Sequence, residues 1–112
     1  MAQTPEGKVK DFVKKILKRY KDDGQGVYAH WPVQNGYGAA CLDCHGCYNG
    51  LYFTIETKAP GKKPTPRQEL TMEDVSEADG VVFVIGEKEV EGKERYSGVY
   101  ELVEWLESER RS

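Results

Sequence analysis

Two acidic residues and a lysine in the middle of the chain have the types and spacing of a metal-dependent hydrolytic site. Asp43 lies before an Asn49-Gly50 pair, and Glu56 and Lys58 lie after it. Asn-Gly favours a two-residue hairpin turn, because both central positions need positive φ. A turn centred on this pair places Asp43 directly opposite Glu56, with Cβ atoms roughly 5 Å apart. The two carboxylates are then close enough to bind one divalent cation.

Alternation along the two hairpin strands separates an apolar face from a polar face. The apolar face is predicted to contain Leu42, Cys44, Tyr48, Leu51, Phe53 and Ile55. The polar face is predicted to contain Cys41, Asp43, His45, Thr54, Glu56 and Lys58. Opposed carboxylates repel each other, and a bound Mg²⁺ or Mn²⁺ removes this repulsion, since hard cations bind oxygen ligands. Lys58 is then placed to orient a water molecule or to stabilise charge on a phosphate.

A simpler interpretation of the same residues is a Glu56–Lys58 ion pair on a solvated strand. Such pairs are common in a chain of which 31% of the residues are charged. The register that brings Asp43 opposite Glu56, with an apolar face behind it, favours the metal site over this alternative.

Length and composition predict one folded domain covering residues 1–112. The net charge of −3 argues against a uniformly basic nucleic-acid binder. Basic residues are nevertheless concentrated in Lys8–Lys21 and Lys58–Arg67, which leaves room for a side that faces phosphates. An odd number of cysteines, a polar N-terminus and the lack of a long apolar run predict a cytoplasmic protein with no membrane association.

Hydrophobic periodicity predicts an α/β fold with the order α-β-β-β-α-β-α around a small mixed sheet. The predicted elements are a helix over 5–22, a strand over 27–33, the two hairpin strands, a helix over 66–78, a strand over 81–85 and a last helix capped by Ser97. The first two helices share a Thr-Pro start. The strand over 81–85 is expected to be buried on both faces. Turns are expected at 34–38 and around Glu91-Gly92.

Glu6 lies in the first turn of the first predicted helix. It precedes Val9 and Val13 by about one and two turns, so it lies on or near the buried side of the helix. Two interpretations remain open from the residues alone. Glu6 either points inward toward a site or only complements the helix dipole.

A zinc site is the rival interpretation of the hairpin. Cys41, Cys44 and Cys47 follow one another at Cys-x2-Cys spacing, and His45 lies among them. On a strand, however, Cys44 points away from the other three side chains, so the four ligands converge only if the hairpin is broken. Cys44 is better interpreted as a small core residue.

The order of these residues resembles the PD-(D/E)XK nuclease superfamily and is most similar to its VRR-NUC (virus-type replication-repair nuclease) family. The matching features are Glu6 in TPE, Asp43 in CLD, Gly50 before the second hairpin strand, the segment IETKAPGKKPTPRQ ending at Gln68, and an apolar strand after Gly80. The resemblance covers residues 4 to about 86. One position departs from the family pattern, because Leu42 stands where a proline normally precedes the aspartate.

The resemblance implies roles for individual residues. The metal ligands it implies are Glu6, Asp43, Glu56 and the carbonyl of Thr57. The catalytic residues it implies are Glu6, Asp43, Glu56, Lys58 and Gln68, with Lys58 positioning the attacking water and Gln68 supporting the site. The residues expected to contact nucleic acid are His45, Lys62, Lys63 and Arg67.

The implied activity is Mg²⁺- or Mn²⁺-dependent hydrolysis of DNA phosphodiester bonds, with a preference for branched DNA like that of a Holliday-junction resolvase. The family also implies a homodimer, in a bacterial cell or a phage-infected host. Tyr100 and Trp105 lie outside the main apolar stripe of the last helix, and they either contact a second subunit or complete the monomer's core. The alternative function is a non-catalytic DNA-binding or zinc-stabilised interaction module on the same fold.

Overall fold

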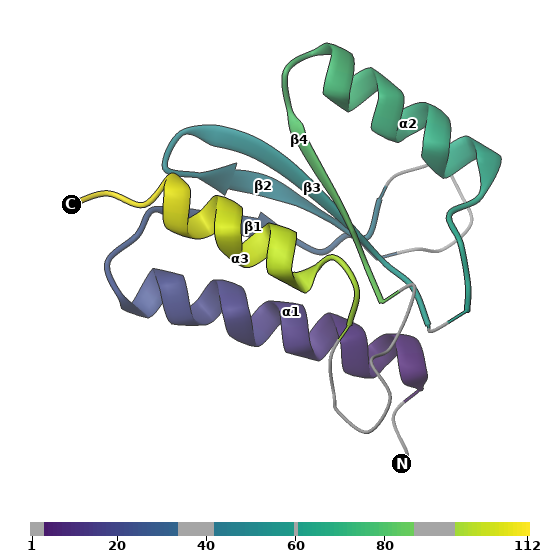
Figure 1. Ribbon diagram of the computed structural model, residues 1–112, viewed down its shortest axis with the longest axis horizontal. Coiled ribbons are helices and arrows are strands. Elements are labelled where there is room, and N and C mark those ends of the chain that lie inside the picture. Colours follow the sequence, from purple (N-terminus) through teal and green to yellow (C-terminus); the bar gives the residue numbers. More distant parts are fainter. Residues whose placement is uncertain (1–3, 34–41, 60, 87–95) are drawn as a thin grey trace.

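The described part of the computed structural model, residues 4–33, 42–59, 61–86 and 96–112, contains three helices and four strands (Figure 1). In chain order they are α1 (Pro5–Asp22), β1 (Val27–His30), β2 (Cys44–Tyr48), β3 (Leu51–Thr57), α2 (Pro66–Glu77), β4 (Val81–Ile85) and α3 (Val99–Ser108). The predicted α/β class is confirmed for this part of the chain, whose described elements run α-β-β-β-α-β-α.

The strands form one mixed sheet in the order β1-β2-β3-β4. The first three strands are antiparallel to one another, and β4 is parallel to β3. The helix α2 makes the crossover between these parallel strands and packs against β4, whereas α1 and α3 lie side by side over the sheet (Figure 1). The expected small mixed sheet is therefore present.

The core lies between the sheet and the helices α1 and α3. Helical spacing on α1 buries Val9, Val13, Ile16, Leu17 and Tyr20. They pack with Leu102 and Leu106 of α3 and with Cys44, Tyr48, Phe53, Ile55, Phe83 and Ile85 of the sheet. None of the helices in the described ranges combines the length and apolar character needed to cross a membrane.

Trp105 belongs to this core. Its ring centroid lies 5.4 Å from that of Tyr48, 5.9 Å from that of Phe53 and 5.4 Å from that of Phe83. These are ordinary distances for packed aromatic rings. Of the two aromatic residues expected to contact a partner or to complete the core, Trp105 completes the core and Tyr100 remains 75% exposed.

Three element boundaries differ from the sequence-based predictions, the smallest difference being that α2 ends at Glu77 and not at 78. The strand β1 ends at His30 because Pro32 has no N–H group and restricts Trp31 before it. The helix α3 is capped by Gly98 at φ 86° and not by Ser97, because an added Cβ at Gly98 would lie 2.1 Å from the Val84 carbonyl oxygen.

The expectation that the strand over 81–85 is buried on both faces is also wrong. In the sheet, β4 is an edge strand, and Val82 and Val84 are only half-buried. An uninterrupted apolar run identifies a strand but does not say how much of each face the helices cover. The turns expected at 34–38 and around Glu91-Gly92, and the position of Cys41, fall outside the described residues.

Candidate metal centre

The hairpin between β2 and β3 has the predicted turn and register. Asn49 has φ 49° and Gly50 has φ 88°, as a type I′ turn requires. Tyr48 pairs with Leu51 at the turn, and the same register continues to the pairing of Cys44 with Ile55. One step further along the hairpin, Asp43 and Glu56 meet.

Asp43 and Glu56 are in direct contact across the hairpin. The backbone N–H of Asp43 donates a hydrogen bond of 3.1 Å to Glu56 Oε1. Both side chains are buried, with exposed fractions of 7% for Asp43 and 1% for Glu56. The polar face of the hairpin is therefore not solvated at this point, and a simple surface ion pair does not describe it.

The Asp43 carboxylate is held by two partners. Its Oδ2 accepts hydrogen bonds from the backbone N–H of Thr57, at 2.9 Å, and from the Thr57 hydroxyl, at 2.8 Å. Its Oδ1 lies 3.6 Å from Lys10 Nζ of α1. Sequence reasoning missed both Lys10 and the Thr57 hydroxyl. The available signal for Lys10 was its place one helical turn after Glu6, on the same side of α1.

The Glu56 carboxylate is poorly compensated. Burial, followed by the negative charge of Asp43, raises the pKa of Glu56 from its ordinary value to about 6, against the opposing effects of Lys58 and the Asp43 N–H. Lys58 Nζ lies 3.0 Å from Glu56 Oε2 and forms an ion pair with it. This oxygen nevertheless has no well-aligned hydrogen bond in the structure. The Lys58 ammonium group is the partner beside this oxygen, so a cation that binds there has to displace or share it.

The residues of this site fit a divalent cation. Asp43 and Glu56 provide carboxylate oxygens, the ligands that Mg²⁺ and Mn²⁺ prefer. Mg²⁺ in particular takes one or two carboxylates and fills its remaining positions with water and substrate phosphate. Glu56 Oε2, which accepts no well-aligned hydrogen bond, is an oxygen ligand of the kind that such a cation binds. Across the described ranges, no group of three or more His, Cys, Asp or Glu side chains is gathered closely enough to hold a metal ion.

Glu6 and Gln68 do not join Asp43 and Glu56 in one cluster. Glu6 is half-buried in the first turn of α1, one turn before the Lys10 side chain that contacts Asp43. Gln68 forms a capping box at the start of α2, where its Oε1 accepts from the Thr65 N–H at 2.9 Å and its own N–H donates to Thr65 Oγ1. The structure therefore gives Gln68 a local role in the helix cap, and its supporting role in the site stays a prediction.

The residues predicted to contact nucleic acid are near the carboxylates in the sequence. Lys62, Lys63 and Arg67 are exposed on the segment that leads from Lys58 into the first turn of α2. His45 is half-buried, and its ring centroid lies 5.4 Å from that of His30 on β1.

The two described cysteines, Cys44 and Cys47, do not share a face of the hairpin. Cys44 is buried and Cys47 is exposed, as expected for residues on opposite faces of β2. Burial, with a smaller effect of the Asp43 charge, raises the pKa of the Cys44 thiol to about 12. A thiol in this environment remains protonated and is a poor zinc ligand. Cys41 lies outside the described residues.

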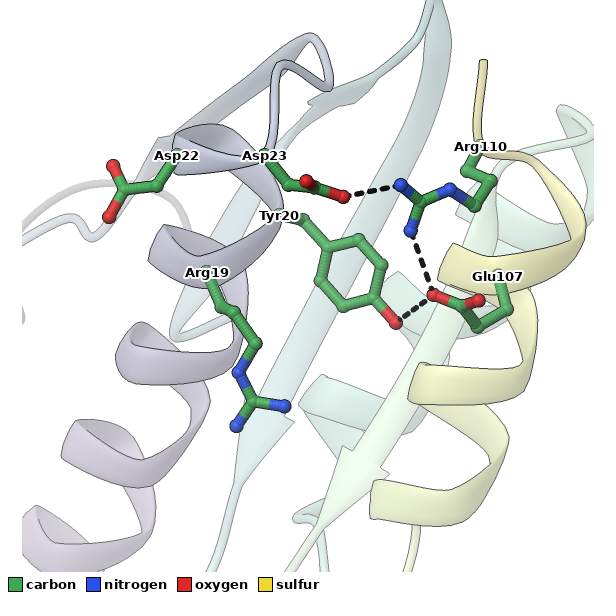
Figure 2. A pocket seen from close by; sticks show the side chains of 6 residues that line it. All are labelled: Arg19, Tyr20, Asp22, Asp23, Glu107 and Arg110. Carbon is green, nitrogen blue, oxygen red and sulfur yellow. Dashed lines mark hydrogen bonds and ion pairs between the residues drawn. The ribbon is translucent and has the colours of Figure 1, made fainter. Parts of the chain in front are cut away.

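A second polar cluster lies where α1 and α3 end, around a hollow of about 470 Å³ (Figure 2). The Tyr20 hydroxyl donates to Glu107 Oε2 at 2.5 Å, and Arg110 joins Glu107 to Asp23. Burial and the bond to Glu107 raise the pKa of Tyr20 to about 12. Because Arg110 bridges the two acids and Tyr20 bonds to one of them, we interpret the cluster as a tie between α1 and α3 and name it the helix clasp.

Comparisons with known proteins add no family to this description. Neither a protein-family model nor a curated protein matches the chain. A functional assignment therefore depends on the geometry of the carboxylate pair and on the motif that carries it.

Proposed function

We propose that this chain is a Mg²⁺- or Mn²⁺-dependent DNA endonuclease with a PD-(D/E)XK core of the VRR-NUC type. The observation that supports the proposal is the contact between Asp43 and Glu56 across the hairpin, with Lys58 Nζ 3.0 Å from Glu56 Oε2. Two buried carboxylates facing each other destabilise an empty sheet, and a bound cation removes that cost.

The chemistry divides between the cation and the side chains. A bound Mg²⁺ or Mn²⁺ supplies Lewis acidity and lowers the pKa of a water molecule for phosphodiester hydrolysis. Asp43 and Glu56 would hold the cation. The further ligands we propose are the Thr57 carbonyl and Glu6, and the Glu6 side chain would have to move toward the pair, because it is not gathered with them in the structure. The Thr57 N–H and hydroxyl fix the Asp43 carboxylate in one orientation. Lys58 positions the attacking water and stabilises negative charge on the phosphate.

The substrate we propose is branched DNA, cleaved by a homodimer in the manner of a Holliday-junction resolvase. Exposed Lys62, Lys63 and Arg67 would contact phosphates beside the scissile bond, which would orient the substrate without reading its sequence. His45 is the further DNA contact, and Gln68 supports the site by fixing the start of α2. One centre per chain makes one cut, so symmetric resolution of a junction requires two chains.

Cleavage of a DNA panel tests this proposal. The panel contains a four-way junction, a flap, a nicked duplex, a linear duplex and a single strand, each incubated with Mn²⁺, with Mg²⁺ or with EDTA. We expect cleavage only with a divalent cation, fastest on branched DNA, and absent in Glu56→Gln. A protein that contains zinc and cuts none of these DNAs under any condition would instead support the non-catalytic module.

A further inference from the structure

A basic hollow lies between α1 and the edge strand β1, away from the helix clasp. It has a volume of about 260 Å³, and Lys14, Lys18 and Lys21 of α1 line one side of it. Leu17 and Val27 contribute apolar surface to the same hollow. Three lysines around one hollow form a local positive region in a chain whose net charge is −3.

The lysines of this hollow continue a row that begins at the candidate metal centre. Lys10, Lys14 and Lys18 are four residues apart, so their side chains follow one another along one side of α1 at intervals of about 6 Å. The first of them, Lys10, lies 3.6 Å from Asp43 Oδ1. We name Lys10, Lys14, Lys18 and Lys21 the α1 lysine row.

Two neighbours of the row determine how its charges are presented. Lys14 Nζ lies 5.1 Å from the centroid of the Trp31 ring, a cation–π distance that holds the ammonium group over the end of β1. Lys18 pairs with Asp22 at 2.7 Å, but both side chains are exposed, and phosphate or salt competes effectively for such a pair. The row is therefore a track of positive charge in which Lys10 is paired with buried Asp43 and Lys18 is weakly paired with Asp22.

We propose that the α1 lysine row binds the sugar–phosphate backbone of the DNA strand that leaves the candidate metal centre, an inference that rests on the proposed nuclease function. The row spans about 16 Å from Lys10 to Lys21, or four to five phosphates at about 3.4 Å of axial rise per nucleotide. Lys62, Lys63 and Arg67 follow the carboxylates along the chain, so the centre has basic residues from two separate segments. DNA crossing the centre then has phosphate contacts on both segments.

A matched pair of double variants tests this track. The variant K14Q/K21Q removes two charges from the row, and the control K8Q/K15Q removes two exposed charges from the opposite flank of α1. Affinity for a four-way junction is measured by fluorescence anisotropy in EDTA, where no cleavage occurs, at several salt concentrations. The row variant is expected to bind about tenfold more weakly and to lose about two from the slope of log affinity against log salt. The control is expected to change affinity by less than twofold.

The outcomes separate this inference from the proposed function. Equal weakening by both double variants, or by neither, overturns the track, even if the wild-type protein cleaves DNA. A wild-type protein that does not bind DNA also overturns it. If the row variant binds weakly and the control does not, the track is supported. This holds even if no cation promotes cleavage by the wild-type protein, and in that case only the nuclease proposal fails. Binding to a polyglutamate peptide is measured with the same variants. If the row variant also loses that binding and the control does not, the row is a general anion site and the assignment to DNA is overturned.

Discussion

Asp43 and Glu56 carry like charges in a nearly dry environment, and the chain compensates them unequally. Asp43 receives two hydrogen bonds from Thr57 and faces Lys10. Glu56 receives one from the Asp43 N–H and faces Lys58. A cation that binds between the carboxylates therefore competes with two ammonium groups that already neutralise them. Metal affinity is set by this competition as much as by the carboxylates.

The pKa of Glu56 predicts a pH dependence of stability in the metal-free protein. Because the pKa of about 6 in the folded state exceeds the ordinary value of 4.5, the folded state binds more protons between these values. The free energy of unfolding therefore falls as pH rises through this window, by about 2 kcal/mol in full and about 1 kcal/mol between pH 5 and pH 7. Urea unfolding in EDTA measures it.

The variant Glu56→Gln is the control for that measurement, because it cannot ionise at this position. Its free energy of unfolding is expected to lack the contribution of Glu56 between pH 5 and pH 7. Parallel pH profiles for the wild-type protein and the variant would contradict the raised pKa.

Lys58→Ala is expected to abolish cleavage and also to destabilise the metal-free protein. Lys58 is only 15% exposed and faces a carboxylate that is 1% exposed, so its loss leaves a buried charge unpaired. We expect a cost of about 2–3 kcal/mol in EDTA, and Mg²⁺ should recover part of it by replacing the missing positive charge. Cleavage rates and thermal unfolding, each with and without Mg²⁺, measure the two effects.

Lys15→Ala, on the exposed flank of α1, is the matched control and should change neither quantity measurably. A Lys58 variant that cleaves at the wild-type rate with Mg²⁺ would exclude the catalytic role.

At the scale of whole elements, the helix clasp joins the ends of two helices that are far apart in sequence. Tyr20 belongs to α1 and Glu107 to α3, and their hydroxyl–carboxylate bond is part-buried (Figure 2). The clasp lies at the C-terminal end of α1, whereas Lys10, which contacts Asp43, lies near its N-terminal end. Stability and activity should therefore be separable by changes at the clasp.

Tyr20→Phe is expected to lower Tm by about 4–8 °C, because it removes the donor to Glu107 and keeps the aromatic ring in the core. Cleavage measured well below Tm should be unchanged. Tyr100→Phe, at a tyrosine that is 75% exposed, should leave Tm within about a degree of the wild-type value. A Tyr20 variant with normal Tm and reduced cleavage would mean that the clasp acts on the site.

The hairpin was predictable because two independent signals agree there. Asn49-Gly50 set the turn, and alternation of polar and apolar residues set the register that joins Asp43 to Glu56. The burial of Glu56 was not predictable, because the alternation of side chains along a strand assigns a residue to a face without saying what covers that face. The contact between Lys10 and Asp43 joins a helix to the residue before β2, and no local pattern encodes the distance between them.

Gln68 and Ser97 show a second limit of the sequence. The Thr65–Gln68 spacing fits both a capping box and a supporting role in the site, and the structure places the Gln68 carbonyl in the cap. Serine is a residue type that often caps helices, but Gly98, which approaches the Val84 carbonyl closely, is the N-cap, so α3 starts one residue later than Ser97 predicts. A local pair of hydrogen bonds determined the first outcome, and a tertiary contact determined the second.

At the scale of the molecule, Tyr100 is the exposed aromatic residue on α3 that we propose as part of the dimer contact. Tyr100→Glu is expected to shift the protein toward monomer and to reduce paired cleavage of a four-way junction at least tenfold, without a loss of Tm. Light scattering and junction cleavage measure these effects. Tyr28→Glu, at a tyrosine of β1 that is 64% exposed, is the control. A wild-type monomer that resolves junctions would contradict the dimer.

The parallel pairing of β3 with β4 has a consequence for the order in which the site assembles during folding. The hairpin joins residues that are near neighbours in the chain, whereas Phe53 finds Val81 only after the intervening segment, with α2, has closed as a loop. We expect the two carboxylates to meet early, while the bond from the Lys58 N–H to the Ile85 carbonyl forms late. Destabilising changes at Asn49-Gly50 should then slow folding, and changes in β4 should mainly speed unfolding.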